Sequence, residues 1–294
     1  QGYVYNRAAA NLRRQVSSSV ALVLNDLSNP FFAEFATGVD EALAGQGYVT
    51  LLGGTGESTE RQGKVLKTLW EHGPAGIILS PAEGSDGETL RRMLGVALPV
   101  VVFNRALPGS GWDFLVCDNR RGAYLATRHL LDSGHRDIAF FGGHANSSSC
   151  HERRLGYADA LAEADLPLRL ERMVESTPNR IDAAARAGFL LYGDSGRASA
   201  AVCYNDAVAL GLQHGLAARG LHVGRDFALV GFDDIPEAAV AFPPLTTIAT
   251  EPRALGRRAA EMLLYRLDQP EAPTQHTVAP VRLVVRGSCS GGVA

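Results

Sequence analysis

Polar side chains that can bind a small molecule follow closely after apolar runs in this sequence. The runs are Val20–Leu24, Val100–Phe103, Ala200–Tyr204 and Phe227–Phe232, and the side chains behind them are Asp26, Asn104, Arg105, Asn205 and Asp233. Carboxylates and amides accept hydrogen bonds from hydroxyl groups, and the fork of an arginine holds a carboxylate, a diol or a phosphate through two bonds. These residue types predict a binding site for a small polar ligand.

Two phenylalanines add an apolar surface to this set. Phe31 and Phe32 open the segment behind Asp26, and we expect one ring to stack on a ring-shaped ligand and the other to pack in the core. Asn104 and Arg105 fit a surface turn leading to Pro108-Gly109 as well as they fit a ligand contact. The residues alone leave these two interpretations open.

Enzyme, metal and cofactor motifs are not found. The loop of residues 53–56 resembles a nucleotide-binding turn, but Thr59 stands where glycine or alanine is needed and Glu57 would face the pyrophosphate. Residues 151–155 begin like a zinc-binding H-E-x-x-H motif and end in leucine. The four cysteines are scattered without a C-x-x-C pair, which favours free thiols. We therefore expect no metal, no cofactor and no catalysis.

Apolar runs alternate with amphipathic segments along the chain, which predicts parallel sheets covered on both faces by helices. Further strands are expected at Tyr48–Leu52, Ala75–Leu79, Phe114–Cys117 and Ile138–Phe141. Helices are expected at Phe31–Gln46, Ser58–Glu71, Arg120–Ser133, Arg153–Ala164, Ile181–Tyr192 and Asp206–Arg219. So many strands favour two doubly wound α/β lobes over one.

We expect the first lobe to take residues 18–118 and 247–277, and the second lobe residues 119–246 and 278–289, with a tail at 290–294. Three crossovers then join the lobes, near Asp118–Asn119, Pro244–Thr247 and Thr277–Pro280. Ligands of parallel α/β sheets bind outside the carboxyl ends of the strands. The polar side chains above should therefore face a cleft between the lobes.

Charge is unevenly distributed. The net charge of −3 argues against a nucleic-acid surface over most of the chain, yet residues 1–25 carry three arginines and no acidic residue. Residues 1–19 contain no apolar signal-peptide core, and no apolar stretch of about 18 residues predicts a membrane span. We therefore expect a cytoplasmic protein without membrane contact.

Residues 1–17 form a separate basic arm. Ala8–Leu12 favours a short helix with Asn6 as its N-cap, although a helix of this length is unstable alone in water. Such a segment can fold on DNA, with arginines on phosphates and Leu12 wedged into the minor groove. From charge alone, a solvated terminus or a helix packed on its own domain is the simpler interpretation.

Several stretches together resemble the LacI/GalR family of repressors, from Gly2 to Ser288. They are GYVYNRAAANLRR, CDNRRGAYLATRHLLDSGHRDIAFFGG, YNDAVALGLQHGLAARG and VGFDDIP followed by FPPLTTIATEPRALGRRAAEMLL. The resemblance implies a periplasmic-binding-protein-like fold of type I, a homodimer, and a helix-turn-helix upstream of residue 1. It makes residues 1–17 the DNA hinge, whose residues are Asn6, Arg7, Ala9, Leu12 and Arg13. Without the helix-turn-helix, the chain as given should bind operator DNA weakly.

The resemblance also assigns effector contacts. It places Arg153, three residues before Gly156, in the cleft, together with Asn205 and Asp233. We expect Asp206, next to Asn205, to be a helix cap. The family's commonest effectors are sugars and their derivatives, whose binding alters affinity for operator DNA. The departures SSSCHERR, ESTPNRID and FNRALP leave the effector's identity open.

A periplasmic sugar-binding protein of the same fold is the alternative function. It predicts a signal peptide or an acid-tolerant mature terminus, and does not predict the NRAAANLRR arm. Dimerisation in solution also separates the two, because transport receptors of this fold are generally monomers.

Overall fold

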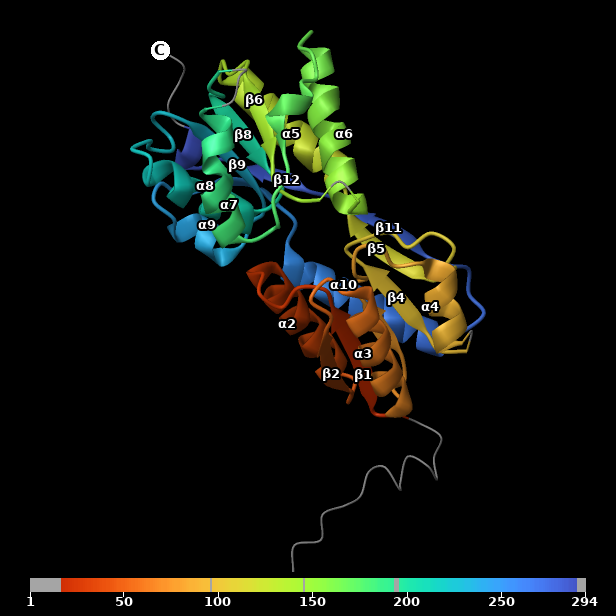
Figure 1. Ribbon diagram of the computed structural model, residues 1–294. Helices are drawn as coiled ribbons and strands as arrows, with labels where there is room; N and C mark the ends of the chain where they lie inside the picture. Colours follow the sequence, from red (N-terminus) through yellow and green to blue (C-terminus); the bar gives the residue numbers. More distant parts are fainter. Residues whose placement is uncertain (1–16, 96, 145, 193–195, 290–294) are drawn as a thin grey trace, which may run out of the picture. The chain divides into compact units, whose positions relative to one another are not determined.

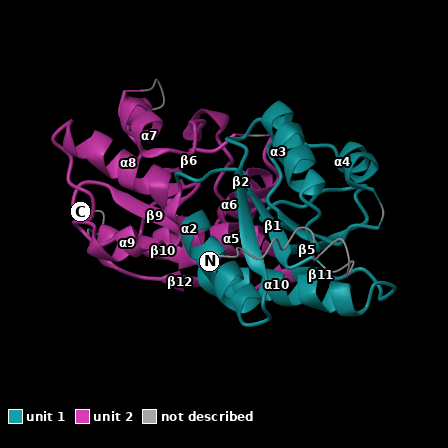
Figure 2. Cartoon of the chain, turned by 90° about the horizontal axis from the view of Figure 1, so that it is seen from below, with its two compact units in different colours: residues 1–28, 32–115, 252–277 teal, residues 29–31, 116–251, 278–294 magenta. Residues whose placement is uncertain are grey.

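A computed structural model describes residues 17–95, 97–144, 146–192 and 196–289 (Figure 1). The chain divides into two compact units (Figure 2). Unit 1 comprises the described residues of 1–28, 32–115 and 252–277, and unit 2 comprises those of 29–31, 116–251 and 278–294.

The first sheet has six strands in the order β11-β5-β4-β3-β1-β2. Its strands are β1 (Ser19–Leu24), β2 (Val49–Gly54), β3 (Ile77–Leu79), β4 (Val100–Phe103), β5 (Asp113–Cys117) and β11 (His276–Ala279). Strands β1 to β5 pair in parallel. The helices of unit 1 are α2 (Pro30–Ala44), α3 (Thr59–Glu71), α4 (Gly87–Leu94) and α10 (Pro252–Asp268).

The second sheet has six strands in the order β12-β10-β9-β8-β6-β7. Its strands are β6 (Ile138–Phe141), β7 (Met173–Val174), β8 (Ala200–Cys203), β9 (Ala228–Asp233), β10 (Thr246–Ala249) and β12 (Arg282–Val284). Neighbouring strands of this sheet pair in parallel, except that β10 and β12 are antiparallel. The α-helices of unit 2 are α5 (Asn119–Asp132), α6 (Ser148–Glu163), α7 (Arg180–Arg186), α8 (Asp206–Ala217) and α9 (Pro236–Val240), and short 3₁₀ segments lie at Leu170–Arg172, Ala187–Leu190 and Gly287–Cys289.

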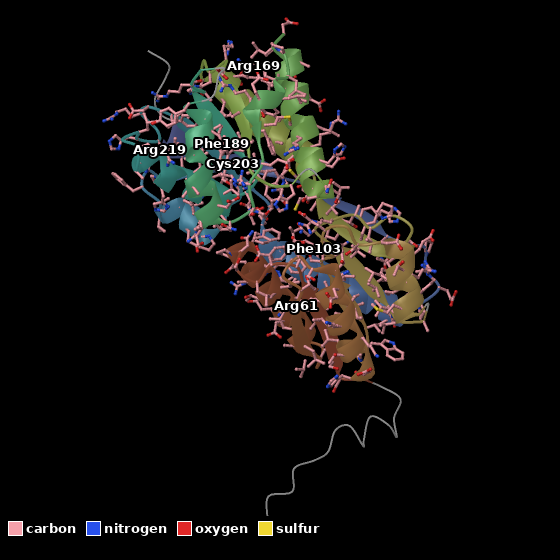
Figure 3. The ribbon with its side chains drawn as sticks, viewed as in Figure 1. Arg61, Phe103, Arg169, Phe189, Cys203 and Arg219 are labelled. Atoms are coloured by element: carbon pink, nitrogen blue, oxygen red, sulfur yellow. The ribbon has the colours of Figure 1, made fainter. Side chains whose placement is uncertain are left out.

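Buried strands explain the apolar runs of the sequence. Every residue of β4, β6, β8 and β9 is buried, because helices cover both faces of each sheet. In unit 1, Phe103 at the end of β4 stacks on Phe35, with ring centroids 3.7 Å apart; in unit 2, Cys203 closes β8 (Figure 3). The four cysteines are free thiols, as predicted, and all four are buried.

The two mostly parallel sheets confirm the predicted fold class. Gly134 and Gly220 adopt the positive φ values of 94° and 79° expected behind helices α5 and α8. Within the described part of the chain, no helix is both long and apolar enough to cross a membrane.

Some predicted boundaries differ from the structure. Helix α6 begins at Ser148 rather than Arg153, because Ser147 already has the extended backbone of an N-cap residue. The predicted helix Ile181–Tyr192 ends at Arg186 and continues as a 3₁₀ segment through Gly188, a residue type that weakens helices.

The predicted second crossover falls on a strand. Thr246–Ala249 forms the buried β10, which pairs with β9 in the register Thr246↔Val230, so these residues belong to unit 2. The units change at 115/116 and 251/252 rather than at 118/119 and 246/247, and the change at 277/278 lies where it was predicted.

Candidate functional site

Arg153 is the centre of a polar cluster in unit 2. Its side chain is buried, and Nε donates to Oδ1 of Asn119 at 2.8 Å while Nη1 donates to the backbone carbonyl of Tyr204. The guanidinium carbon lies 3.6 Å from the ring centroid of Phe232, and Nη2 lies 3.8 Å from Oδ1 of Asp233. The structure therefore brings together the predicted residues Arg153 and Asp233.

A close approach of two helices places Arg153 there. A Cβ atom on Gly156 would lie 1.9 Å from the carbonyl oxygen of Arg120, so only glycine lets α6 pack this tightly on α5. Asn119 is the first residue of α5, and Asp118 caps the helix by accepting from the N–H of Arg121 at 3.0 Å. Gly156, three residues after Arg153, thus lets Arg153 come within hydrogen-bond distance of Asn119.

Asp233 ends β9 in a strained turn. Asp233 and Asp234 have positive φ values of 118° and 58°, which are unfavourable for residues with a side chain. The hydroxyl of Thr250 donates to the Asp233 carbonyl at 3.1 Å, and Arg286 binds the Asp234 carboxylate at 2.6 Å. Burial raises the pKa of Asp233 to about 7, although the charge of Arg153 opposes this shift.

The prediction that Asp206 caps helix α8 is wrong, because Asn205 is the cap. Oδ1 of Asn205 caps α8 by accepting from the N–H of Val208 at 2.8 Å, which leaves its amide N–H groups for another partner. Asp206 is fully buried and accepts from the N–H of Ile235 at 2.9 Å and the hydroxyl of Thr247 at 2.5 Å. Asp206 is therefore not the cap, because its carboxylate points to the turn behind Asp233 and to β10.

The space for this carboxylate comes from a glycine in β9. A Cβ atom on Gly231 would lie 2.1 Å from Oδ1 of Asp206. Burial raises the pKa of Asp206 well above its ordinary value, and the nearby charge of Asp233 adds to the shift. Asp206 holds the Asp233 turn through its bonds to Ile235 and Thr247.

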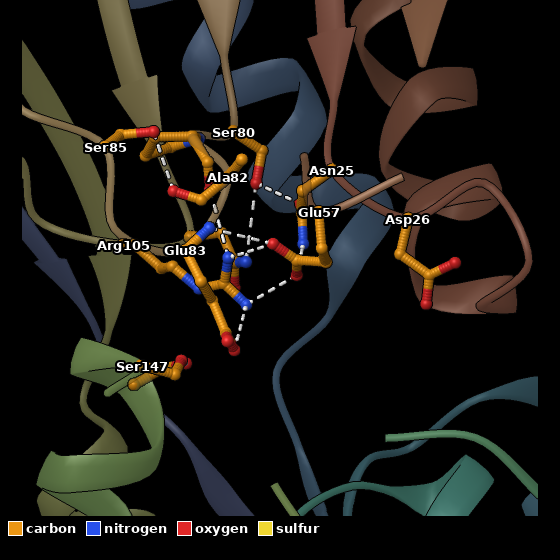
Figure 4. Close-up of polar contacts among 12 residues, drawn as sticks. Asn25, Asp26, Glu57, Ser80, Ala82, Glu83, Ser85, Arg105 and Ser147 are labelled. Carbon is orange, nitrogen blue, oxygen red and sulfur yellow. Dashed lines mark hydrogen bonds and ion pairs between the residues drawn. The ribbon is translucent and has the colours of Figure 1, made fainter. Parts of the chain in front are cut away.

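In unit 1, Arg105 lies at the centre of a second polar cluster (Figure 4). Its two terminal nitrogens each donate to one oxygen of Glu57 at 2.8 Å, and Nη1 also donates to the carbonyl of Pro81 at 3.0 Å. The carboxylate of Glu83 lies 3.6 Å away. Because Arg105 is only 5% exposed, its interpretation as a surface-turn residue is wrong.

Glu57 connects the loops behind four strands. Its oxygens also accept from Nδ2 of Asn25 at 2.6 Å and from the N–H of Glu83 at 3.0 Å. Burial raises the pKa of Glu57, but the hydrogen bonds and charge of Arg105, with the other two donors, outweigh burial and lower it below the ordinary value. The loops behind β1, β2, β3 and β4 are thus joined at one ionised carboxylate.

The other predicted effector contacts lie behind β1, at the start of α2 and behind β4. Asp26 is half-buried and accepts from the N–H and hydroxyl of Ser28 at 2.8 and 2.6 Å. Asn104 has a φ of 70° and donates to the hydroxyl of Ser80 at 3.4 Å. Phe31 and Phe32 are each 5% exposed. Effector contact by these residues stays a prediction.

Sequence reasoning missed Glu57, Asn119 and Tyr204 as members of these clusters. Tyr204 closes an apolar run, yet its hydroxyl lies 3.0 Å from that of Ser149. The available signal for Glu57 was its place directly after a glycine-rich turn at the end of a strand.

The predicted hinge residues Asn6, Arg7, Ala9, Leu12 and Arg13 lie outside the described residues. Among those described, no group of three or more metal-binding side chains is found.

Comparisons with known proteins identify the family. Residues 127–289 match the model of a periplasmic binding protein-like domain. The chain is 32% identical to the HTH-type transcriptional repressor PurR of Vibrio campbellii over 288 residues, covering 97% of this chain and 85% of the relative. The chain belongs to the LacI family of transcriptional regulators.

Other members of the LacI family agree with this assignment. The maltose regulon regulatory protein MalI of Escherichia coli is 31% identical, over 96% of this chain and 85% of its own. A LacI family transcriptional regulator from Enterococcus faecium, solved with bound ribose, is 28% identical with a TM-score of 0.83, over 94% of this chain and 100% of its own. These relatives are regulators of transcription, which favours a repressor over a periplasmic transport receptor.

Proposed function

We propose that this chain is the effector-sensing core of a transcriptional repressor. It binds a small polar effector, a sugar or sugar derivative, at the carboxyl ends of its parallel strands, and binding alters the affinity of a homodimer for operator DNA. The observation that carries the proposal is the buried pair of Arg153 in α6 and Asp233 at the end of β9. The names of the relatives support it, and one related regulator was solved with bound ribose.

The chemistry of the pair suits a diol. Arg153 commits Nε and one Nη1–H to protein acceptors, which leaves N–H groups of its fork for ligand oxygens. In its ionised form the carboxylate of Asp233 accepts from sugar hydroxyls, and the amide N–H groups of Asn205, whose oxygen caps α8, are further donors. A guanidinium, a carboxylate and an amide together offer both hydrogen-bond donors and acceptors to two adjacent hydroxyl groups.

We propose a coupling to DNA that uses residues of both units. We propose that Asp26, Phe32, Asn104 and Arg105 complete the site from unit 1 and favour closure of the units. Closure would shift the hinge segments, residues 1–17, of a two-fold dimer and change their fit to a palindromic operator. Such coupling is typically worth about 1–3 kcal/mol. A cytoplasmic location and the absence of catalysis complete the proposal.

A thermal-shift screen tests this function. Sugars, sugar acids, sugar phosphates, polyols and nucleobases are each added to the protein. A ligand at about 100 times its Kd should add roughly 2.7 kcal/mol of stability, and the melting temperature should rise clearly. Asp233→Asn should remove the rise while Asp132→Asn, an exposed residue of α5, should keep it. A hit that survives Asp233→Asn would refute the site.

A further inference from the structure

The contact between Arg105 and Glu57 has the geometry of an arginine bound to an anionic ligand. Both terminal nitrogens donate at 2.8 Å to separate oxygens of one carboxylate. This two-bond arrangement is how proteins hold ligand carboxylates and phosphates. At the strand ends of unit 1, the chain's own glutamate occupies the position that such an anion would take.

Glu57 is fixed in this position from several directions. Asn25 and the backbone of Glu83 donate to its two oxygens, and Glu57 itself sits at a φ of 60°. A residue held in a left-handed turn by loops behind other strands cannot leave Arg105 without breaking all of these bonds. An incoming anion therefore meets an arginine whose fork is already occupied.

The charge of the cluster opposes an anion as well. Glu57 and Glu83 surround the single cation of Arg105, so the three side chains carry a net charge of about −1 when ionised. A phosphate or carboxylate brought to this edge adds a like charge beside two partly buried carboxylates. A hydroxyl group, in contrast, can donate to carboxylate oxygens without displacing Glu57.

We propose that Glu57 is a specificity-determining residue that mimics a bound anion, so that the site accepts uncharged, hydroxyl-bearing effectors and excludes sugar acids and sugar phosphates. This inference rests on the proposed function, since it concerns the same effector site. Whatever the effector is, removal of the Glu57 charge should turn Arg105 into a binding site for anions.

The test uses inorganic phosphate as the probe in thermal-shift measurements, with sodium chloride at equal ionic strength as the salt control. Glu57→Gln should gain a phosphate-dependent rise in melting temperature that the wild-type protein lacks. Glu57→Gln combined with Arg105→Gln should lose the gain. Glu60→Gln, an exposed neighbour on α3 that pairs with Lys64, is the matched control and should behave like the wild-type protein. If phosphate leaves Glu57→Gln no more stable than Glu60→Gln, Glu57 only fastens the loops and the proposal is overturned.

A second measurement uses the wild-type protein and does not depend on the folding of any variant. Calorimetry compares uncharged pentoses and hexoses with their phosphate esters and uronic acids. The anionic form should bind at least about tenfold more weakly than the uncharged sugar. An anionic form that binds as tightly as the uncharged sugar overturns the inference and leaves the repressor function intact. If no sugar of either kind binds while phosphate stabilises Glu57→Gln through Arg105, the proposed sugar effector fails and the role of Glu57 is upheld.

Discussion

Arg105 and Arg153 are two buried arginines near strand ends, and their surroundings differ in charge. Arg105 is held by the carboxylate of Glu57 through two 2.8 Å bonds and has Glu83 at 3.6 Å. Arg153 is held by neutral acceptors and an aromatic ring, and its carboxylate partner Asp233 lies 3.8 Å away. The difference shows how one residue type serves two purposes. Arg105 is paired with two carboxylates, whereas Arg153 keeps N–H groups that can bind a ligand.

The largest expected effect is on stability. Arg105→Met should reduce the free energy of unfolding by about 3 kcal/mol, because Glu57 and Glu83 would be left partly buried without their cation. Arg153→Met should cost less, about 1–2 kcal/mol, since its acceptors are neutral and Asp233 can take up a proton. Urea denaturation of both variants measures the difference. Equal losses would remove the distinction between the two arginines.

Asp233→Asn should weaken effector binding by roughly 30-fold or more, because an amide cannot replace a carboxylate that accepts from two hydroxyls. The fold should persist, since burial already favours a neutral side chain at this position. Calorimetry with the effector from the screen and circular dichroism check both statements. Binding at wild-type strength would place the effector elsewhere.

Asp206 positions the turn that holds Asp233, and we expect it to affect effector binding through this turn rather than by touching the effector. Asp206→Ala should weaken effector binding about tenfold by releasing the N–H of Ile235 and the hydroxyl of Thr247. Asp206→Asn should restore most of the affinity, since an amide can accept from the N–H of Ile235 and donate to the hydroxyl of Thr247. A failure of the asparagine to rescue binding would show that the negative charge itself is needed.

The smallest expected effect is a pH dependence that separates the two clusters. The folded-state pKa of Asp233 is raised to about 7, so its contribution to the stability of the ligand-free protein is present at acidic pH and lost as pH rises through 7. Effector hydroxyls that need the ionised carboxylate should bind about tenfold more tightly at pH 8 than at pH 6, with Arg153 and Asp206 as the facing groups. Titration calorimetry at both pH values measures this.

Glu57 should show the opposite dependence of stability. Its folded-state pKa lies below the ordinary value, so its contribution is present above pH 4.5 and lost as pH falls below it. As the pH falls, Glu57→Gln should therefore lose less of its free energy of unfolding than the wild-type protein does. The same acid sensitivity in both proteins would contradict the ion pair.

The sequence predicted the fold and the positions of polar side chains behind strands, because apolar runs and their ends are local features. It did not predict the partners. Glu57 meets Arg105 across 48 residues of chain, and Asn119 meets Arg153 across 34. Nor could it tell which of Asn205 and Asp206 caps α8, because both side chains suit a cap and the choice depends on the space that Gly231 leaves. Short half-exposed strands such as β7 and β12 carry no apolar run and were not predicted.

The most direct test of the central claim measures operator affinity of the full-length repressor with and without the effector found in the screen, for the wild-type protein and for Asp233→Asn. The account predicts a change of about 5- to 150-fold in the wild-type protein and none in the variant, while both bind operator equally without effector. An operator affinity that the effector leaves unchanged in the wild-type protein, or changes equally in Asp233→Asn, would contradict it.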